Sequence, residues 1–280
     1  MPELPEVEAA RRLARRVAMG RRIVGVWCAP DAIVCERVAP DRIRRALLGR
    51  RVTGVGRHGK HFWLELDRRP WPSFHFGMAG GLHAPADPGA RLVSHGARGG
   101  PGVSWPPRFA KLVLDLSGGR ALAFADGRRL GRIRLREDPR TTAPISGLGF
   151  DALDALPAPA RFHALLAPRG APVKAVLLDQ GFAAGIGNWI ADEVLYQARV
   201  APKRRASTLT RVETGRIRAA IRLVVGTAVR VGSDGDRFPK GWLFHRRWGK
   251  KAGSSDARGR AIRHDTVGGR TTAWVPALQK

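Results

Sequence analysis

The pattern of apolar and polar residues predicts a helix at the start of the chain, over about Leu4–Met19. Apolar residues recur there at helical spacing and form one stripe of Val7, Ala10, Leu13, Ala14 and Val17. Pro5 suits the first turn of a helix, and Gly20 can end it. Pro2 and Glu3 precede this helix, and the helical pattern gives no reason for either residue.

Residues 22–135 follow the period of β-strands rather than that of helices. The stretches KHFWLEL and RFAKLVLDL alternate apolar with polar residues, and SGG at 117–119 predicts a hairpin turn before RALAF. Residues 84–107 are rich in glycine and proline and predict a long loop among the strands. This part of the chain is therefore expected to consist mainly of strands and turns.

The pattern changes near residue 139. Between about 151 and 231 the apolar positions return to helical spacing, which predicts several helices. After residue 237, short aromatic and β-branched runs stand between glycine-rich turns. A chain of 280 residues is long enough for two domains, and these changes of period suggest where they divide.

Charge narrows the choice of partner. The chain has 50 Lys and Arg against 23 Asp and Glu, a formal net charge of +27, and a pI near 11.8. Such a charge repels itself in a compact monomer unless a polyanion is bound, so nucleic acid is the leading partner. A membrane surface is a weaker candidate because the sequence has no transmembrane run and no lipidation motif. A high net charge is also typical of proteins from an organism whose proteome is generally rich in arginine, so the charge alone does not identify the partner.

The two cysteines, Cys28 and Cys35, are too few to staple a secreted fold of this size or to form a four-ligand zinc site. We expect them to be small buried hydrophobic residues. The N-terminus lacks the apolar segment of a signal peptide. The expected location is therefore a reducing compartment that contains nucleic acid, the cytoplasm or nucleoid of a prokaryote or a nucleus, and not the secretory route.

Pro2 has a possible chemical role. If Met1 is removed, which a small second residue permits, the chain begins with a secondary amine. An α-amine has a pKa of about 7.7 to 8.0, so part of it is neutral and nucleophilic near neutral pH. It can attack the C1′ atom of a nucleoside sugar and form an iminium ion, with Glu3 transferring protons. The dipeptide is also commonplace after an initiator methionine, which leaves a structural role open.

Two other stretches carry candidate side chains. Lys60 precedes an apolar strand and shares its face, which is costly unless the lysine lies at the strand end and reaches a cleft or water. Met78 and the run Arg128–Leu130 lie in two glycine-flanked turns. Proteins that extrude a base fill the vacated stack with apolar or guanidinium groups, as these residues could. A core methionine and solvated arginines would explain the same residues separately.

The stretch VKAVLLDQGFAAGIGNWIADEVLYQARVAP predicts two helices joined by a glycine-rich turn. The first helix contains Lys174, and Asn188 lies where it can cap the second, whose first turn would carry Asp192 and Glu193. Backbone N–H groups could approach a phosphate closely at the turn glycines, which are Gly181, Gly185 and Gly187. An ordinary helix pair remains the alternative.

Together these stretches resemble the formamidopyrimidine-DNA glycosylase and endonuclease VIII family of base-excision repair enzymes. PELPEVE at 2–8 matches the family's N-terminal motif, and GK at 59–60, HFGMAG at 75–80, DGRRLG at 126–131 and LLDQGFAAGIGNWIADEVLYQA at 177–198 match later blocks in order and spacing. The similarity spans nearly the whole chain.

The resemblance implies an α+β fold in three parts. Residues 1–140 would form a catalytic β-sandwich domain with the N-terminal helix, and residues 141–235 a helix-two-turn-helix domain. Residues 236–280 would form a β-hairpin. Most relatives bind zinc through four cysteines in this last part, which here has none, so the chain resembles the zincless-finger branch of plant and fungal members. Metal-free packing would then rest on Trp242, Phe244, Trp248 and Trp274.

The resemblance also implies roles for individual residues. Pro2 would be the nucleophile, Glu3 its proton-transferring partner, and Lys60 a contact to the phosphate beside the lesion that assists the eliminations. The DNA-binding residues would be Asn188, Arg270, Lys174 and Arg129. The residues that fill the void left by the flipped base would be Met78, Arg128 and Leu130. No cofactor and no metal is expected.

The implied activity is excision of oxidised bases from damaged double-stranded DNA, followed by β,δ-elimination, by a monomer that does not bind membranes. Formamidopyrimidines, hydantoins and oxidised pyrimidines are the expected lesions. The segment 231–241 is short where relatives use a longer loop to cover 8-oxoguanine, so that lesion is expected to be a poor substrate. A catalytically silent damaged-DNA-binding protein and an architectural or RNA-binding protein remain alternatives.

Overall fold

The computed structural model describes residues 2–85, 104–248 and 253–280. Contacts divide the chain into two units. Unit 1 comprises residues 1–147 and 232–234, and unit 2 comprises residues 148–231 and 235–280. Most of the loop expected at 84–107 lies outside the described residues. The boundaries expected at residues 140 and 235 stay a prediction.

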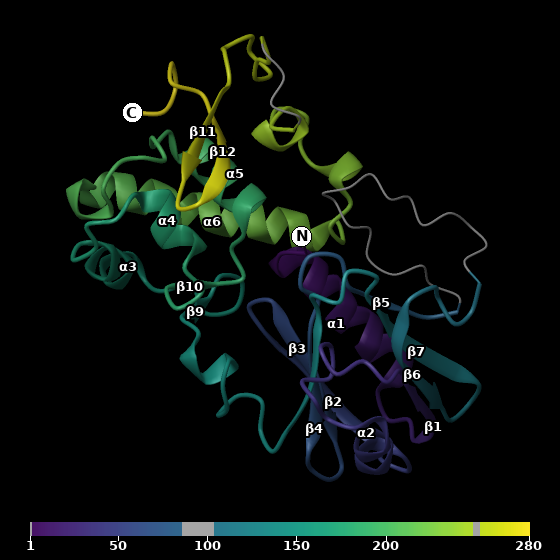
Figure 1. Ribbon diagram of the computed structural model, residues 1–280. Helices are drawn as coiled ribbons and strands as arrows, with labels where there is room; N and C mark the ends of the chain where they lie inside the picture. The colour runs from purple at the N-terminus through teal and green to yellow at the C-terminus, as the bar shows by residue number, and fades with distance from the viewer. Residues whose placement is uncertain (1, 86–103, 249–252) are drawn as a thin grey trace. The chain divides into compact units, whose positions relative to one another are not determined.

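Unit 1 contains two four-stranded antiparallel sheets (Figure 1). The strands of the first sheet, in spatial order, are β1 (Ile23–Cys28), β6 (Ala110–Leu116), β7 (Arg120–Ala125) and β5 (Gly81–His83). Those of the second are β2 (Val52–His58), β3 (His61–Leu66), β4 (Trp71–His75) and β8 (Arg132–Arg136). The predicted hairpin at 117–119 joins β6 to β7, with Gly118 and Gly119 at positive φ.

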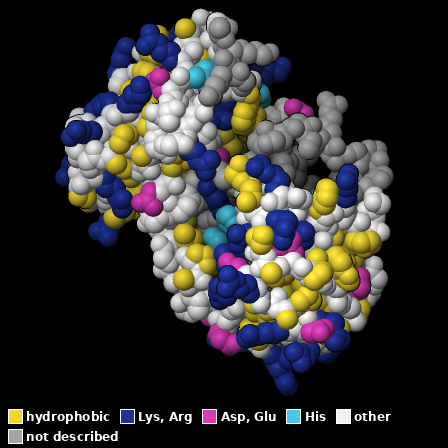
Figure 2. Space-filling view, viewed as in Figure 1, with side chains coloured by type: hydrophobic (Ala, Val, Ile, Leu, Met, Phe, Trp, Pro, Cys, Tyr) yellow, Lys and Arg dark blue, Asp and Glu magenta, His cyan; other side chains and the backbone are white. Residues whose placement is uncertain are grey.

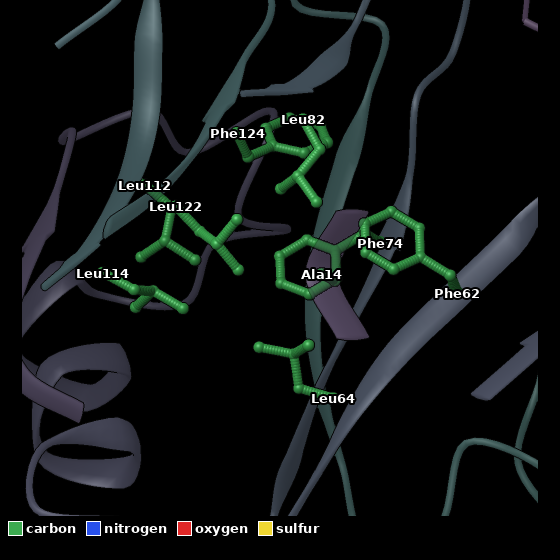
Figure 3. A pocket seen from close by; sticks show the side chains of 9 residues that line it. All are labelled: Ala14, Phe62, Leu64, Phe74, Leu82, Leu112, Leu114, Leu122 and Phe124. Carbon is green, nitrogen blue, oxygen red and sulfur yellow. The ribbon is translucent and has the colours of Figure 1, made fainter. Parts of the chain in front are cut away.

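Helix α1 (Leu4–Ala18) packs against strands of both sheets, and the apolar stripe predicted for it is buried. Figure 3 shows how apolar side chains of α1 and both sheets meet around an apolar pocket in the interior of unit 1. Two short helices complete the unit, α2 (Pro40–Leu47) and the 3₁₀ helix η1 (Ile145–Gly147). Helix α2 was not expected among the strands, and it buries Ile43 and Leu47.

Unit 2 is helical, as the spacing predicted. Its helices are α3 (Pro159–Leu166), α4 (Val173–Leu178), α5 (Asn188–Ala198) and α6 (Arg211–Arg230), with 3₁₀ turns η2 (Ala206–Thr208), η3 (Gly235–Arg237) and η4 (Leu243–His245). A short parallel pair joins β9 (Phe150–Asp151) to β10 (Ala183–Ala184). The expected C-terminal hairpin pairs β11 (Arg263–Val267) with β12 (Arg270–Trp274). The α+β fold class is therefore confirmed.

The surface is strongly basic. Figure 2 shows Lys and Arg side chains spread over the visible face of each unit, with far fewer Asp and Glu. None of the described helices is both long and apolar enough to cross a bilayer.

Candidate active site

The start of α1 brings two acidic side chains together directly after Pro2. Glu3 is the N-cap residue, its backbone N–H donates to Glu6 Oε2 at 3.0 Å, and the two residues form a capping box. Pro2, Glu3 and Glu6 are all buried. Burial, and then the nearby Glu3 carboxylate, raise the pKa of Glu6 to about 8. Glu6 therefore holds a proton at neutral pH beside the residue predicted to transfer one.

Arg57 connects this helix to the turn that carries Lys60. Its Nε lies 3.1 Å from Glu8 Oε2 on α1, and its Nη1 donates to the Gly59 carbonyl at 3.2 Å. The Arg57 side chain is 1% exposed, so this ion pair is well shielded from water. Lys60 occupies the turn between β2 and β3 rather than the face of a strand. The strand end is the position that the sequence analysis required for a lysine next to this apolar strand.

Two stacked histidines lie beside Lys60. The rings of His61 and His75 have centroids 4.6 Å apart on neighbouring strands. Burial lowers the pKa of His75 to about 4, and the charge of Lys60 is the next cause. A neutral His75 can accept a hydrogen bond, and its Nδ1 takes one from the Gly77 N–H at 3.2 Å. His75 thereby fixes the turn on which Met78 lies.

The Met78 turn meets the 126–131 loop within unit 1. A Cβ on Gly77, which has φ +59°, would collide with the Leu130 carbonyl, so the two backbones touch. The Asp126 carboxylate closes the loop by accepting from Arg128 N at 2.9 Å and from Gly131 N at 2.6 Å. Arg128 and Leu130 are exposed and Met78 is half-buried. The structure therefore brings together the three residues expected to fill a vacated base stack.

Arg129, between two of these residues, points to a carboxylate. It adopts φ +56°, and its Nε and Nη2 lie 3.0 and 3.1 Å from the Asp31 carboxylate. Asp31 also binds Lys111 Nζ at 2.8 Å. Burial of Asp31 opposes ionisation, but these cationic partners outweigh it and lower its pKa. A DNA contact by Arg129 stays a prediction, and it would have to compete with this ion pair.

In unit 2, the predicted DNA-binding residues gather around one carbonyl of the hairpin. Asn188 Nδ2 donates to the Thr271 carbonyl at 2.9 Å, and Lys174 Nζ donates to the same oxygen at 3.1 Å. Arg270 directly precedes Thr271, begins β12 and is exposed. The tip of the hairpin is a Gly268–Gly269 turn, and a Cβ on Gly268 would press against Ala175 of α4. The hairpin thus presents Arg270 from a fixed position.

Two expectations for this region are wrong. Asn188 does not cap α5: Gly187 is the N-cap residue, and the Asn188 amide binds the hairpin instead. Asp192 and Glu193 lie in the second turn of the helix. A DNA contact by Lys174 stays a prediction. Lys174 is fully buried and forms an ion pair with Asp192 at 2.6 Å, so a phosphate would have to compete with this pair.

The turn between α4 and α5 is organised by a side chain that the sequence did not single out. Gln180 Oε1 accepts from Gly185 N at 3.1 Å, and its Nε2 donates to the carbonyls of Leu178 and Ile186. The Gly181 N–H donates to Asp179 Oδ1 at 2.9 Å. The amides of Gly181 and Gly185 are therefore engaged within the protein, contrary to the expectation that they face a phosphate.

Asp192 connects the hairpin to the helices. Its carboxylate pairs with Lys174 and with Arg247 Nη2 at 2.7 Å, and accepts from Ala273 N at 3.1 Å. All three charged side chains are at most 5% exposed. One buried anion between two buried cations therefore ties α4, α5 and β12 to the segment that follows η4.

Family models match both parts of the chain. Residues 1–133 match the formamidopyrimidine-DNA glycosylase N-terminal domain, and residues 148–240 match the H2TH domain of the same enzymes. The chain belongs to the formamidopyrimidine-DNA glycosylase family. This confirms the resemblance seen in its motifs.

Relatives of this family member cover its whole length. The formamidopyrimidine-DNA glycosylase of Arabidopsis thaliana is 41% identical over 280 residues, which are 100% of this chain and 71% of that protein. The one of Thermus thermophilus is 34% identical over 293 residues, covering 100% and 98%. The Lactococcus lactis enzyme, solved with DNA containing an AP site, has a TM-score of 0.79 at 23% identity over 99% of both chains. Its complex with DNA containing an oxidized pyrimidine gives 0.80 at 23% over 100% of both. The structural likeness shows the fold.

The hairpin of this family member does not fit a four-ligand zinc site. Residues 236–280 contain no cysteine, and both histidines there lie against backbone carbonyls. Across the described parts of the chain, no group of three or more His, Cys, Asp or Glu side chains could hold a metal ion. Aromatic rings pack in this region instead: those of Trp189, Phe238, Trp242, Phe244 and Trp248. Trp274 is not in this cluster and donates to Asp265 at 2.8 Å.

Three site residues escaped the sequence analysis. Glu6 had only a partial signal: an acid at N3 fits a capping box, but the N-cap residue here is Glu3 rather than Ser or Thr. Arg57 and Gln180 had none, because their importance lies in contacts that the local pattern does not encode.

Proposed function

We propose that this protein excises oxidised bases from damaged double-stranded DNA and then cleaves the strand through a Schiff base on the nitrogen of Pro2. The observation that carries the proposal is the buried pair of Glu3 and Glu6 directly after Pro2. The pair supplies a proton-holding group and a proton-accepting group beside a terminal amine. Arg57 links the same helix to the turn of Lys60, which supports a phosphate contact there.

The first step displaces the damaged base. With Met1 removed, the Pro2 nitrogen forms a bond to C1′, and the bond between C1′ and the base breaks with its electron pair leaving on the base. The base takes a proton from the Glu3 and Glu6 pair. The Pro2 nitrogen then loses its N–H proton to a carboxylate, and its lone pair forms the C=N bond as the bond from C1′ to O4′ breaks. The O4′ atom takes up the proton, the sugar ring is open, and an iminium ion joins Pro2 to C1′. The positive end of α1 keeps part of the amine neutral before the attack.

Two eliminations follow from the iminium ion, which accepts electrons. Loss of the C2′ proton to a carboxylate breaks the bond from C3′ to oxygen and expels the 3′ phosphate. Loss of the C4′ proton breaks the bond from C5′ to oxygen and expels the 5′ phosphate, leaving a one-nucleotide gap. Water then hydrolyses the iminium ion and frees Pro2. Lys60 stabilises the phosphate that departs.

The two basic units support binding to a duplex with one nucleotide extruded. Arg270 and Asn188 would grip the backbone, and Met78, Arg128 and Leu130 would fill the vacated stack. Extrusion costs a few kcal/mol and less at a damaged pair, which gives part of the selectivity. Formamidopyrimidines, hydantoins and oxidised pyrimidines are the proposed lesions, 8-oxoguanine is a poor one, and the protein acts as a monomer.

Borohydride trapping tests the proposal. The protein is incubated with a duplex carrying an abasic site, and sodium borohydride reduces any iminium ion to a stable adduct. Wild type should form a covalent complex, and Pro2→Gly behind an uncleaved N-terminal tag should form none. Pro5→Ala, in the same helix, is the matched control and should still be trapped. A wild-type protein that shifts damaged DNA without an adduct would instead be a silent damage-binding protein, and a preference for duplex RNA would indicate an RNA-binding protein.

A further inference from the structure

The two cysteines of the chain lie side by side in unit 1, away from the start of α1. Cys28 is the last residue of β1, and Cys35 lies in the turns that follow. Their Sγ atoms are 3.8 Å apart and both thiols are free. Cys35 is 1% exposed, whereas Cys28 is half-buried. Because the chain has two cysteines in all, this pair accounts for every thiol.

The segment between the two cysteines binds the 126–131 loop, which carries the void-filling residues Arg128 and Leu130. Asp31 lies in this segment, and its Oδ1 accepts from the backbone of Ile33 at 3.1 Å and of Val34 at 3.2 Å. The same carboxylate binds the Arg129 guanidinium. The Val34 carbonyl also accepts from Ile133 N at 2.8 Å, just after the loop. The segment between the cysteines therefore contacts residues 129–133 at both ends, at Arg129 and at Ile133, and a movement of its backbone would shift both contacts.

The sulfur atoms are in a suitable state to react. A hydrogen bond from Cys28 lowers the pKa of Cys35, against the opposing effect of burial. The thiolate is the reactive form of cysteine, and a second thiol close by can resolve an oxidised sulfur.

We propose that Cys28 and Cys35 are a redox modification site that forms a reversible intramolecular disulfide when a hydroperoxide oxidises it, and that this bond loosens the hold of Asp31 on Arg129. A thiolate sulfur attacks the peroxide oxygen and becomes a sulfenic acid, releasing hydroxide. The second sulfur then displaces hydroxide from the sulfenic acid and forms the S–S bond. Two thiol hydrogens and one hydrogen peroxide leave as two waters, and the two electrons lost by sulfur reduce the peroxide.

The geometry explains the coupling. A disulfide requires a sulfur separation of about 2 Å, so the 3.8 Å gap must shorten. The strand position of Cys28 is fixed by its pairing with Leu112 of β6. We therefore expect the turns that contain Asp31 and Cys35 to move as the sulfur atoms approach, and the Asp31 carboxylate to shift relative to Arg129. This coupling rests on the proposed function. Releasing Arg129 from Asp31 frees its guanidinium, but moving the loop also misplaces Arg128 and Leu130, the proposed void-filling residues, and we expect this loss to weaken binding to damaged DNA. Disulfide formation itself does not rest on the proposed function.

Mass spectrometry tests disulfide formation without DNA. The full chain is treated with hydrogen peroxide, its remaining thiols are alkylated, and the protein is digested. A single chain in which Cys28 is linked to Cys35, lighter by two hydrogens and restored by dithiothreitol, is expected. Alkylation of both thiols after peroxide, a disulfide between two chains, or sulfinic acid without a disulfide would each overturn the proposal. Cys28→Ser and Cys35→Ser show which signal belongs to the pair.

DNA affinity tests the coupling. Binding to a duplex with an uncleavable abasic analogue is measured for the reduced and the oxidised protein, and oxidation should weaken it about fivefold or more. The double variant Cys28→Ser/Cys35→Ser should not respond to peroxide. Asp31→Asn should weaken binding without any oxidant and respond little to it. Equal affinity of both redox forms for damaged DNA would overturn the coupling. Absence of any preference for damaged over undamaged duplex in the reduced wild type would instead count against the proposed function.

Discussion

Helices α1 and α5 both bury carboxyl groups in their first two turns, but they surround these groups differently. At the start of α1, Glu6 lies beside Glu3, and burial first and this second acid next raise the pKa of Glu6 to about 8. In α5, Asp192 lies between Lys174 and Arg247. The comparison shows what decides the use of a buried acid. Next to another acid it holds a proton that can be transferred, and between two cations it is a fixed charge that joins segments.

The largest expected effect separates chemistry from binding at the start of α1. Glu3→Gln removes the group that exchanges protons and should lower the rate of base excision by about 100-fold or more. Its affinity for damaged duplex should change less than about tenfold, since one buried amide replaces one buried carboxyl. Single-turnover excision and a binding titration measure the two. Glu137→Gln, on the exposed surface of unit 1, is the control for loss of charge. A parallel collapse of affinity would contradict the separation of roles.

The next largest effect concerns the fixed charge of α5. Asp192→Ala leaves Lys174 and Arg247 buried without their anion, which should lower the free energy of unfolding by about 3 to 5 kcal/mol. Denaturant unfolding measures this change. Asp41→Ala removes an exposed ion pair with Arg44 and should cost under about 1 kcal/mol. An equal fall in the free energy of unfolding of the two variants would contradict the claim that the buried charge of Asp192 stabilises the fold more than a surface charge does.

A smaller effect should appear in the pH dependence of stability. Glu6 has a raised pKa in the folded protein, so its contribution to stability is complete below 4.5 and is lost as the pH rises through 8. Wild type should therefore lose stability between these values, and Glu6→Gln should lose less. Glu193, whose pKa burial raises to about 7, accounts for part of the remaining slope. Unfolding titrations at several pH values measure both slopes, and identical slopes would refute a protonated Glu6.

Removal of metal ions is expected to have no effect on excision or DNA binding. Because buried ions and aromatic rings join the hairpin to the helices, EDTA should leave excision and DNA binding unchanged. The measurement is activity before and after dialysis against the chelator, with zinc added back as the control. If EDTA abolished activity and zinc restored it, a bound metal would stabilise the protein, which would contradict stabilisation by the buried ions of Asp192, Lys174 and Arg247.

The sequence predicted what local patterns encode. The α1 stripe, the hairpin at 117–119 and the four helices of unit 2 follow from periodicity and turn residues, and the structure contains them. The capping box of Glu3 and Glu6 is less predictable, because a glutamate stands where the usual pattern has Ser or Thr. Helix α2 was missed because eight residues provide too few apolar positions to show a period.

The sequence-based predictions failed where contacts with residues far away in the sequence determine the position of a side chain. Asn188 has the right residue type for a cap, but its amide binds the Thr271 carbonyl, 83 positions away, and Gly187 takes the cap position. The DNA contact of Lys174 stays a prediction, but no sequence pattern shows that Asp192 lies 2.6 Å from its Nζ. Long-range ion pairs of this kind depend on tertiary packing, and local propensity does not contain them.

The central claim is that the Pro2 nitrogen bonds to deoxyribose, and tandem mass spectrometry of the borohydride-trapped complex tests it most directly. After digestion of protein and DNA, the account predicts that the N-terminal peptide begins at Pro2 and carries the reduced sugar on its nitrogen. A sugar attached to Lys60 or any other lysine, or active protein that retains Met1, would contradict the account.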